Sequence, residues 1–203
     1  MMIWNLPNTL TWLRIFAIPL VILLFYLPYR WADPAAGLLF GLAGITDSLD
    51  GYLARRLGQT SRLGAFLDPV ADKLIVAVAL VLLLSKDLEP IAWLSAPTAR
   101  AVLVLTAIVI IGREIAISAL REWMAEIGQR AKVKVSQIAK YKTILQIVGL
   151  SCMLFRWDLP ILPGVALPIF EIGLVLTIVA AFLTLLSAIS YLRAAWPDLR
   201  GSA

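Results

Sequence analysis

The sequence predicts an all-α fold, an integral membrane bundle of six transmembrane helices, in a single domain over residues 1–203. Three observations support this fold class. Apolar residues make up 61% of the chain and charged residues only 15%, with a mean hydropathy of +0.90, whereas soluble domains carry about 25% charged residues. The apolar residues gather in six stretches of about 20 residues, the length that a helix needs to cross a bilayer. The loops between these stretches are short, and no linker divides the chain.

The predicted helices follow one another without repeats or low-complexity segments. We expect residues 1–9 to form a short interfacial segment, with Trp4 at the headgroup level and with Pro7 and Asn8 ending it before the first span. All seven tryptophans lie near the ends of apolar stretches, as in an interfacial aromatic belt. The expected spans are residues 10–28, 34–57, 62–85, 97–124, 134–155 and 167–194.

The distribution of basic residues predicts the orientation of the bundle. The loops at residues 57–61 and 124–134, the two termini and their flanks together hold 14 of the 18 Lys and Arg residues. Because positive charge favours the cytoplasmic side, both termini should face the cytoplasm. This placement accounts for the net charge of +5 without a nucleic-acid partner. The segment before the first span lacks the basic region of a cleavable signal peptide.

The residue types that the chain lacks exclude several kinds of chemistry. It has no histidine, which excludes Ser-His triads, histidine–zinc sites and imidazole acid–base catalysis. Cys152 is the single cysteine, so neither a disulfide framework nor a cysteine–zinc cluster can form within the chain. Catalysis must therefore come from carboxylates, Lys, Arg, Tyr or a metal with oxygen ligands.

Four aspartates fall inside the second and third predicted spans. Asp47 and Asp50 are three residues apart, and Asp68 and Asp72 are four apart, so each pair shares one face of its helix. The short turn at residues 57–61 makes these helices antiparallel neighbours, which should bring the four carboxylates together near the cytoplasmic surface. Each aspartate costs about 2.5–3.5 kcal/mol at the centre of a transmembrane helix.

A bound divalent cation would compensate this charge. Ligation by oxygen alone favours Mg²⁺, Mn²⁺ or Ca²⁺ over zinc. Two alternatives remain open: the aspartates could be helix caps and loop salt bridges, or they could line the ion or proton path of a transporter. The small residues Gly51, Ala54 and Gly64 beside the aspartates would let a nucleotide or phosphate approach the backbone, although close helix packing would also favour them.

These residues form the pattern D-x2-D-G-x2-A-R-x8-G-x3-D-x3-D from Asp47 to Asp72, which resembles the signature of the CDP-alcohol phosphatidyltransferases. The resemblance implies six transmembrane helices, a homodimer and a site open to the cytoplasmic leaflet. It implies two divalent cations, Mg²⁺ or Mn²⁺, held with a diphosphate by Asp47, Asp50 and Asp68. Asp72 would be the general base and could also touch a metal.

The resemblance also implies a nucleotide site. The expected CDP-binding positions are Thr46, Gly51, Ala54, Arg55, Gly64 and Asn8. Thr11 and Arg14 could line the same entrance as Asn8; the alternatives are helix capping for Asn8 and a topology signal for Arg14. Two cations about 3.5–4 Å apart can clamp a diphosphate, so we expect direct displacement without a covalent intermediate.

A second, basic group of residues lies in the fourth and fifth predicted spans. Arg113 follows an apolar run and needs a partner, for which Glu114, one of the aspartates or a phosphate ligand would serve. We expect an acceptor phosphate to be bound by Arg113, Lys140, Lys142 and Arg121. The alternative is a topology signal, which is the better interpretation for Lys132 and Lys134.

Four segments sharpen the resemblance to one subgroup, the bacterial phosphatidylglycerophosphate synthases: residues 5–19, 64–73, 113–126 and 140–146. Ala139 departs from the subgroup, where glycine is common. The resemblance implies a bacterial inner-membrane protein that uses CDP-diacylglycerol and glycerol 3-phosphate among the membrane lipids. The basic group would then bind the phosphate of this acceptor.

Overall fold

The computed structural model describes residues 6–57, 62–88, 91–129, 132, 137–162 and 164–201. Within these ranges it describes the side chains apart from those of residues 6–8, 10, 47–57, 62–63, 65 and 137–140.

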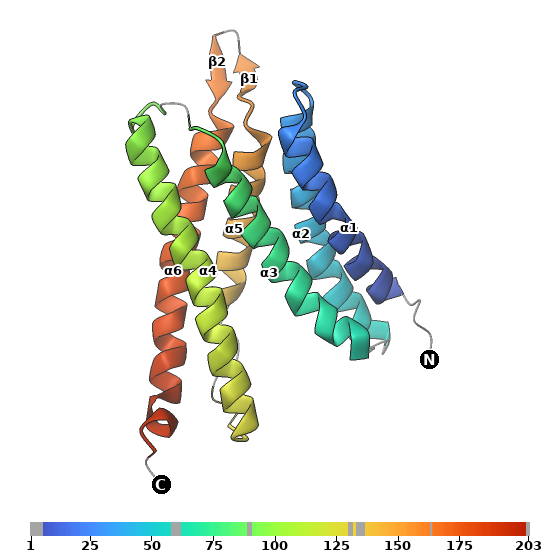
Figure 1. Ribbon diagram of the computed structural model, residues 1–203, viewed down its shortest axis with the longest axis vertical. Helices are drawn as coiled ribbons and strands as arrows, with labels where there is room; N and C mark the ends of the chain where they lie inside the picture. Colours follow the sequence, from blue (N-terminus) through green and yellow to red (C-terminus); the bar gives the residue numbers. More distant parts are fainter. Residues whose placement is uncertain are drawn as a thin grey trace. The chain divides into compact units, whose positions relative to one another are not determined.

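The described part of the chain forms six α-helices and one small hairpin (Figure 1). The helices are α1 (Leu6–Tyr26), α2 (Ala32–Leu57), α3 (Arg62–Ser85), α4 (Ala96–Glu126), α5 (Gln137–Phe155) and α6 (Ile169–Leu199). The hairpin, β1 (Leu159–Leu162) and β2 (Val165–Leu167), is antiparallel, and Leu159 pairs with Leu167. The all-α prediction is confirmed except for this hairpin, which lies where a loop was expected.

The N-terminal prediction needs a correction. Pro7 and Asn8 do not end a separate interfacial segment, because both lie in the first turn of α1. Proline is tolerated there since the first N–H groups of a helix have no partner within it. Residues 1–5 of the predicted segment lie outside the described residues.

Within the described part of the chain, two helices are long and apolar enough to cross a membrane, α4 and α6, with mean hydropathies of 2.1 and 2.6 over an 18-residue window. Shorter apolar segments cover residues 11–26, 32–46 and 141–155. Large apolar side chains also point outward, including Phe16, Phe66 and Phe182. Outward apolar surface on a helical bundle is typical of lipid contact. These features fit a helical membrane bundle.

The chain divides into two compact units. The first unit comprises residues 1–87 and 147–174. In it, α1 packs against α2 and α3, as Figure 1 shows. Its core includes Phe25, Phe40 and Leu80. Close approach of α2 to α5 depends on Gly37, whose carbonyl accepts a 2.7 Å hydrogen bond from the Ser151 hydroxyl.

The second unit comprises residues 88–146 and 175–203. Here α4 and α6 pack through an apolar cluster made of Ile117, Met124, Ala188, Tyr191 and Ala195. The Lys132 ammonium donates to both carboxylate oxygens of Asp198 at 2.8 and 2.9 Å. This ion pair links the segment after α4 to the C-terminal end of α6.

Candidate functional site

The first unit contains an acidic site between α1 and α3. Asp68 and Asp72 lie one turn apart on one face of α3, as the spacing predicted. The Thr11 hydroxyl donates to Asp68 Oδ1 at 2.5 Å, and the Arg14 guanidinium donates to Asp72 Oδ1 and forms an ion pair with it. Two consecutive turns of α1 therefore each supply one donor to one carboxylate of α3.

Burial differs between the two sides of these contacts. Thr11 is 2% exposed and Arg14 is 1% exposed, whereas the Asp72 side chain is 42% exposed. The donors thus lie beneath the carboxylates on the protein side, and part of the Asp72 side chain faces solvent. An ion pair also removes the cost of burying the guanidinium alone.

This donor set fits a hard divalent cation. Asp68 and Asp72 supply carboxylate oxygens, the ligands that Mg²⁺ and Mn²⁺ prefer. Their two negative charges exceed the single positive charge of Arg14, so this part of the site keeps a net negative charge. Buried Gly64 lies one turn before Asp68 on the same helix, so no side chain projects at that position.

The other half of the predicted acidic group is described only in its backbone. Asp47, Asp50, Gly51, Ala54 and Arg55 lie in helix α2, as predicted, but their side chains lie outside the described part. Among the described side chains, no three acidic residues gather as a metal site. The convergence of all four aspartates remains a prediction.

Of two other predicted nucleotide-binding residues, the structure describes the side chain of Thr46 but not that of Asn8. The Thr46 hydroxyl donates to the Ala43 carbonyl of its own helix at 2.8 Å. The side chain of Asn8 lies outside the described part.

Thr11 and Arg14 are the residues whose importance the sequence understated. Arg14 could be interpreted as a topology signal, but its buried ion pair with Asp72 shows that it belongs to the acidic site. A signal was available: Thr11 and Arg14 are three residues apart on one helix face, close to the spacing of Asp68 and Asp72. Polar residues at that spacing in an apolar helix indicate a polar partner on a neighbouring helix.

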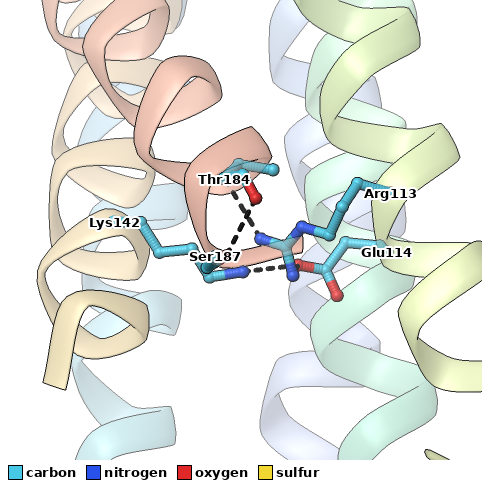
Figure 2. A network of polar contacts seen from close by, with 5 residues as sticks. All are labelled: Arg113, Glu114, Lys142, Thr184 and Ser187. Atoms are coloured by element: carbon cyan, nitrogen blue, oxygen red, sulfur yellow. Dashed lines mark hydrogen bonds and ion pairs between the residues drawn. The ribbon is translucent and has the colours of Figure 1, made fainter. Parts of the chain in front are cut away.

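The second unit contains a basic network, shown in Figure 2. Glu114 bridges two cations: its Oε1 accepts from Lys142 Nζ at 3.2 Å and pairs with Arg113 at 3.0 Å. Arg113 also donates to the Thr184 hydroxyl of α6 at 3.1 Å. The Ser187 hydroxyl donates to the Thr184 backbone carbonyl at 2.8 Å, one turn along α6. Three helices thus contribute to the network.

The network carries excess positive charge. Arg113 and Lys142 are both buried and share the single carboxylate of Glu114, which leaves one net positive charge. The buried Arg113 Nε has no hydrogen-bond partner among the described residues. A buried cation with unused donors suits an anionic ligand such as a phosphate.

The predicted acceptor residues are only partly brought together. Arg113 and Lys142 share the network, and of the partners left open for Arg113 the structure shows an ion pair with Glu114. Arg121 lies about two turns further along α4, over the Tyr191 ring at 5.6 Å from its centroid. The Lys140 side chain lies outside the described part. Thr184 and Ser187 were not anticipated. They are also three residues apart, but an uncharged hydroxyl can bond to the backbone of its own helix, as Ser187 does, and so needs no partner on another helix.

Comparison of the sequence with known proteins identifies its family. The sequence model of the family "CDP-alcohol phosphatidyltransferase" matches residues 4–192. A CDP-diacylglycerol–glycerol-3-phosphate 3-phosphatidyltransferase of Pseudomonas fluorescens is 48% identical over 197 residues, which cover 97% of this chain and 92% of the relative.

Proteins of the same name from Shigella flexneri serotype 5b and Escherichia coli K12 are each 46% identical over 196 residues. Those residues cover 97% of this chain and 97% of each relative. The similarity therefore includes both the acidic site and the basic network. The chain belongs to the CDP-alcohol phosphatidyltransferase family.

Proposed function

We propose that this protein transfers the phosphatidyl group of CDP-diacylglycerol to the 1-hydroxyl of sn-glycerol 3-phosphate, giving phosphatidylglycerophosphate and CMP. The observation that carries this proposal is the near full-length similarity to proteins named for that reaction. The two described sites agree with it, because one is suited to a metal-bound diphosphate and the other to a phosphate.

In the proposed reaction every bond change and the proton transfer can be assigned. The glycerol hydroxyl oxygen forms a bond to the phosphorus that carries the diacylglycerol. The bond from that phosphorus to the bridging oxygen of the diphosphate breaks, and CMP leaves. Asp72 accepts the hydroxyl proton as general base. Its partly exposed carboxylate, held at one oxygen by Arg14, supports this role.

The carboxylates hold the divalent cations on which this family generally depends. Asp47, Asp50 and Asp68 would hold them together with the diphosphate, and Asp72 would also contact a cation. When bound, Mg²⁺ or Mn²⁺ would supply positive charge that stabilises the diphosphate and the leaving phosphate. The open, oxygen-only pair of Asp68 and Asp72 supports this assignment.

The nucleotide is bound by the residues around the aspartates. Gly51, Ala54 and Gly64 let it approach the helix backbone, and Arg55 holds a phosphate oxygen. Thr46 and Asn8 complete the CDP-binding set. Buried Gly64, one turn from Asp68, supports close approach on the α3 side.

The basic network binds the phosphate of the acceptor. Arg113 and Lys142 provide charge-assisted hydrogen bonds, and Lys140 and Arg121 add positive charge. The net positive charge of the buried Arg113–Glu114–Lys142 group supports this assignment, because an uncharged acceptor would leave it without a counterion.

All six helices cross the inner membrane of a bacterium, with both termini and the acidic site on the cytoplasmic side, and the protein works as a homodimer. The excess of Lys and Arg at that side supports the orientation. The membrane setting also matches the lipid substrate, since CDP-diacylglycerol resides in the bilayer.

One assay tests the reaction and the acceptor together. Purified protein in lipid is incubated with CDP-diacylglycerol and Mg²⁺, and CMP release is measured with glycerol 3-phosphate, glycerol, serine and inositol phosphate, each with and without EDTA. Metal-dependent release with glycerol 3-phosphate alone is the expected result. Release with another alcohol would reassign the acceptor, and no release with any acceptor would contradict the proposal and favour cation transport.

A further inference from the structure

The inference concerns how α1 serves the acidic site. Hydrogen bonds between described side chains join α1 to α3 at three levels: Thr11 to Asp68, Arg14 to Asp72, and Tyr26 to Ser85 at 2.9 Å. The sequence separations are 57, 58 and 59 residues. A nearly constant separation over four turns means that the two helices run parallel in a fixed register.

This register separates α1 into two functional parts. From Ala17 to Phe25, the face of α1 that is buried carries only apolar side chains. The first turns of the same face instead carry two buried polar residues, Thr11 and Arg14. Apolar packing therefore sets the height of α1 on α3, and this height delivers both donors at the level of the carboxylates. The exposed Tyr26–Ser85 contact at the far end follows the same register without setting it.

We propose that Thr11 and Arg14 are positioning residues, which hold Asp68 and Asp72 in the orientation that binds the divalent cation. The proposal rests on the proposed function insofar as these aspartates are metal ligands. Each donor engages Oδ1 of its aspartate from the buried side, so the open side of the site is left to the cation. Donors behind metal ligands commonly fix ligand orientation in this way.

A competing arrangement would make Arg14 a stand-in cation that leaves Asp72 when the metal arrives. The burial of Arg14 argues against it, because a guanidinium that is 1% exposed would have to lose its counter-charge without reaching solvent. The two arrangements predict opposite effects on metal affinity: losing a positioning residue weakens binding, whereas losing a competitor strengthens it.

The test measures Mn²⁺ affinity on the full chain in lipid nanodiscs, from the electron paramagnetic resonance signal of free Mn²⁺, with no substrate present. The variants are Thr11→Val and Arg14→Gln, which remove the donors, and Thr11→Ser and Arg14→Lys, which retain one. Tyr26→Phe is the matched control, because it removes a hydroxyl from the same helix pair away from the acidic site. Unfolding temperatures without metal check that each variant is folded.

We expect Thr11→Val and Arg14→Gln to weaken Mn²⁺ binding by about 10- to 100-fold, the usual cost of losing an outer-shell partner. Thr11→Ser should restore most of the affinity, Arg14→Lys part of it, and Tyr26→Phe should bind as the wild type does. In turnover assays, raising the metal concentration should recover kcat in Thr11→Val.

Unchanged Mn²⁺ affinity in Thr11→Val and Arg14→Gln would overturn the proposal and leave these contacts a purely structural role. Tighter binding in Arg14→Gln would overturn it in favour of a competing cation. If Arg14→Gln does not fold, the Thr11→Val and Thr11→Ser pair decides alone, because valine has the shape of threonine. A wild-type protein that binds Mn²⁺ but releases no CMP would contradict the proposed function and leave this comparison valid.

Discussion

The acidic site of the first unit and the basic network of the second are built from the same residue types, with buried cations and a partly exposed carboxylate in both, but they differ in net charge. In the first unit, buried Arg14 supports Asp72, whose side chain is 42% exposed, and the carboxylates are in excess. In the second, Glu114 joins buried Arg113 and Lys142, and the cations are in excess. An Arg–carboxylate pair alone therefore does not show which kind of ligand a site binds. The net charge left over decides whether a site suits a cation or an anion.

The most severe way to break the acidic site is Asp72→Asn. The amide keeps the shape of the side chain but cannot accept the proton of the acceptor hydroxyl. We expect kcat to fall by about 10²- to 10⁴-fold while the protein remains folded. Turnover is measured as CMP release, with Asp87→Asn, at an exposed position beyond α3, as the control. Activity close to that of the wild type would remove Asp72 from the base role.

The corresponding change in the basic network is the double variant Arg113→Gln/Lys142→Gln. It removes both cations that Glu114 joins, so the acceptor phosphate loses its charge-assisted partners. Each such hydrogen bond is worth about 1.5–3 kcal/mol, so the KM for glycerol 3-phosphate should rise by at least about 10-fold. The KM for CDP-diacylglycerol is the internal control and should stay the same. An unchanged acceptor KM would show that the phosphate binds elsewhere.

The two units also differ in how closely other groups approach their helical glycines. A Cβ at Gly37 of α2 would lie 2.6 Å from the Phe155 backbone nitrogen, whereas a Cβ at Gly112 of α4 would meet nothing within 4 Å. We expect Gly37→Ala to lower the free energy of unfolding by about 1–3 kcal/mol through overpacking. Gly112→Ala should instead raise it by up to about 1 kcal/mol, because alanine favours helix.

Thermal unfolding in detergent, followed by circular dichroism, measures both glycine variants. Equal unfolding temperatures for Gly37→Ala and the wild type would contradict the close contact of α2 with α5.

A smaller effect is expected from the hydrogen bond between Arg113 and Thr184 in the basic network. Thr184→Val removes the hydroxyl that accepts from Arg113 but leaves both cations in place. Because the hydroxyl orients Arg113 and does not itself contact the acceptor, the KM for glycerol 3-phosphate should rise less than in the double variant, by about 2- to 10-fold. Thr106→Val is the matched control, since the Thr106 hydroxyl donates within its own helix to Val102. An effect of equal size in both variants would exclude a specific role for Thr184.

The sequence predicted the helices well because long apolar stretches mark them, and the ends of α3 match the prediction at Arg62 and Ser85. It failed at Pro7, since a proline that ends one helix is equally suited to the first turn of another. It also missed the hairpin at residues 159–167, whose residues are all apolar or Gly/Pro and show no strand alternation.

The site residues also fall into those that the sequence could place and those that it could not. Local spacing was enough to place Asp68 and Asp72 on one face of α3, because helix periodicity alone determines it. Local spacing also places Thr11 and Arg14 on one helix face, but which residues they and Thr184 contact depends on the register between helices distant in sequence, which no local pattern encodes. That the side chains of Asp47 and Asp50 join the acidic site stays a prediction.

The central claim is that the acidic site binds the cation and the basic network binds the acceptor. The most direct test measures two constants in one CMP-release assay, the Mn²⁺ concentration for half-maximal activation and the KM for glycerol 3-phosphate, in Asp68→Asn and Arg113→Gln. We predict that Asp68→Asn raises only the Mn²⁺ constant and that Arg113→Gln raises only the acceptor KM. A reversed pattern, or an Asp68→Asn variant with an unchanged Mn²⁺ requirement, would contradict the assignment of the two sites.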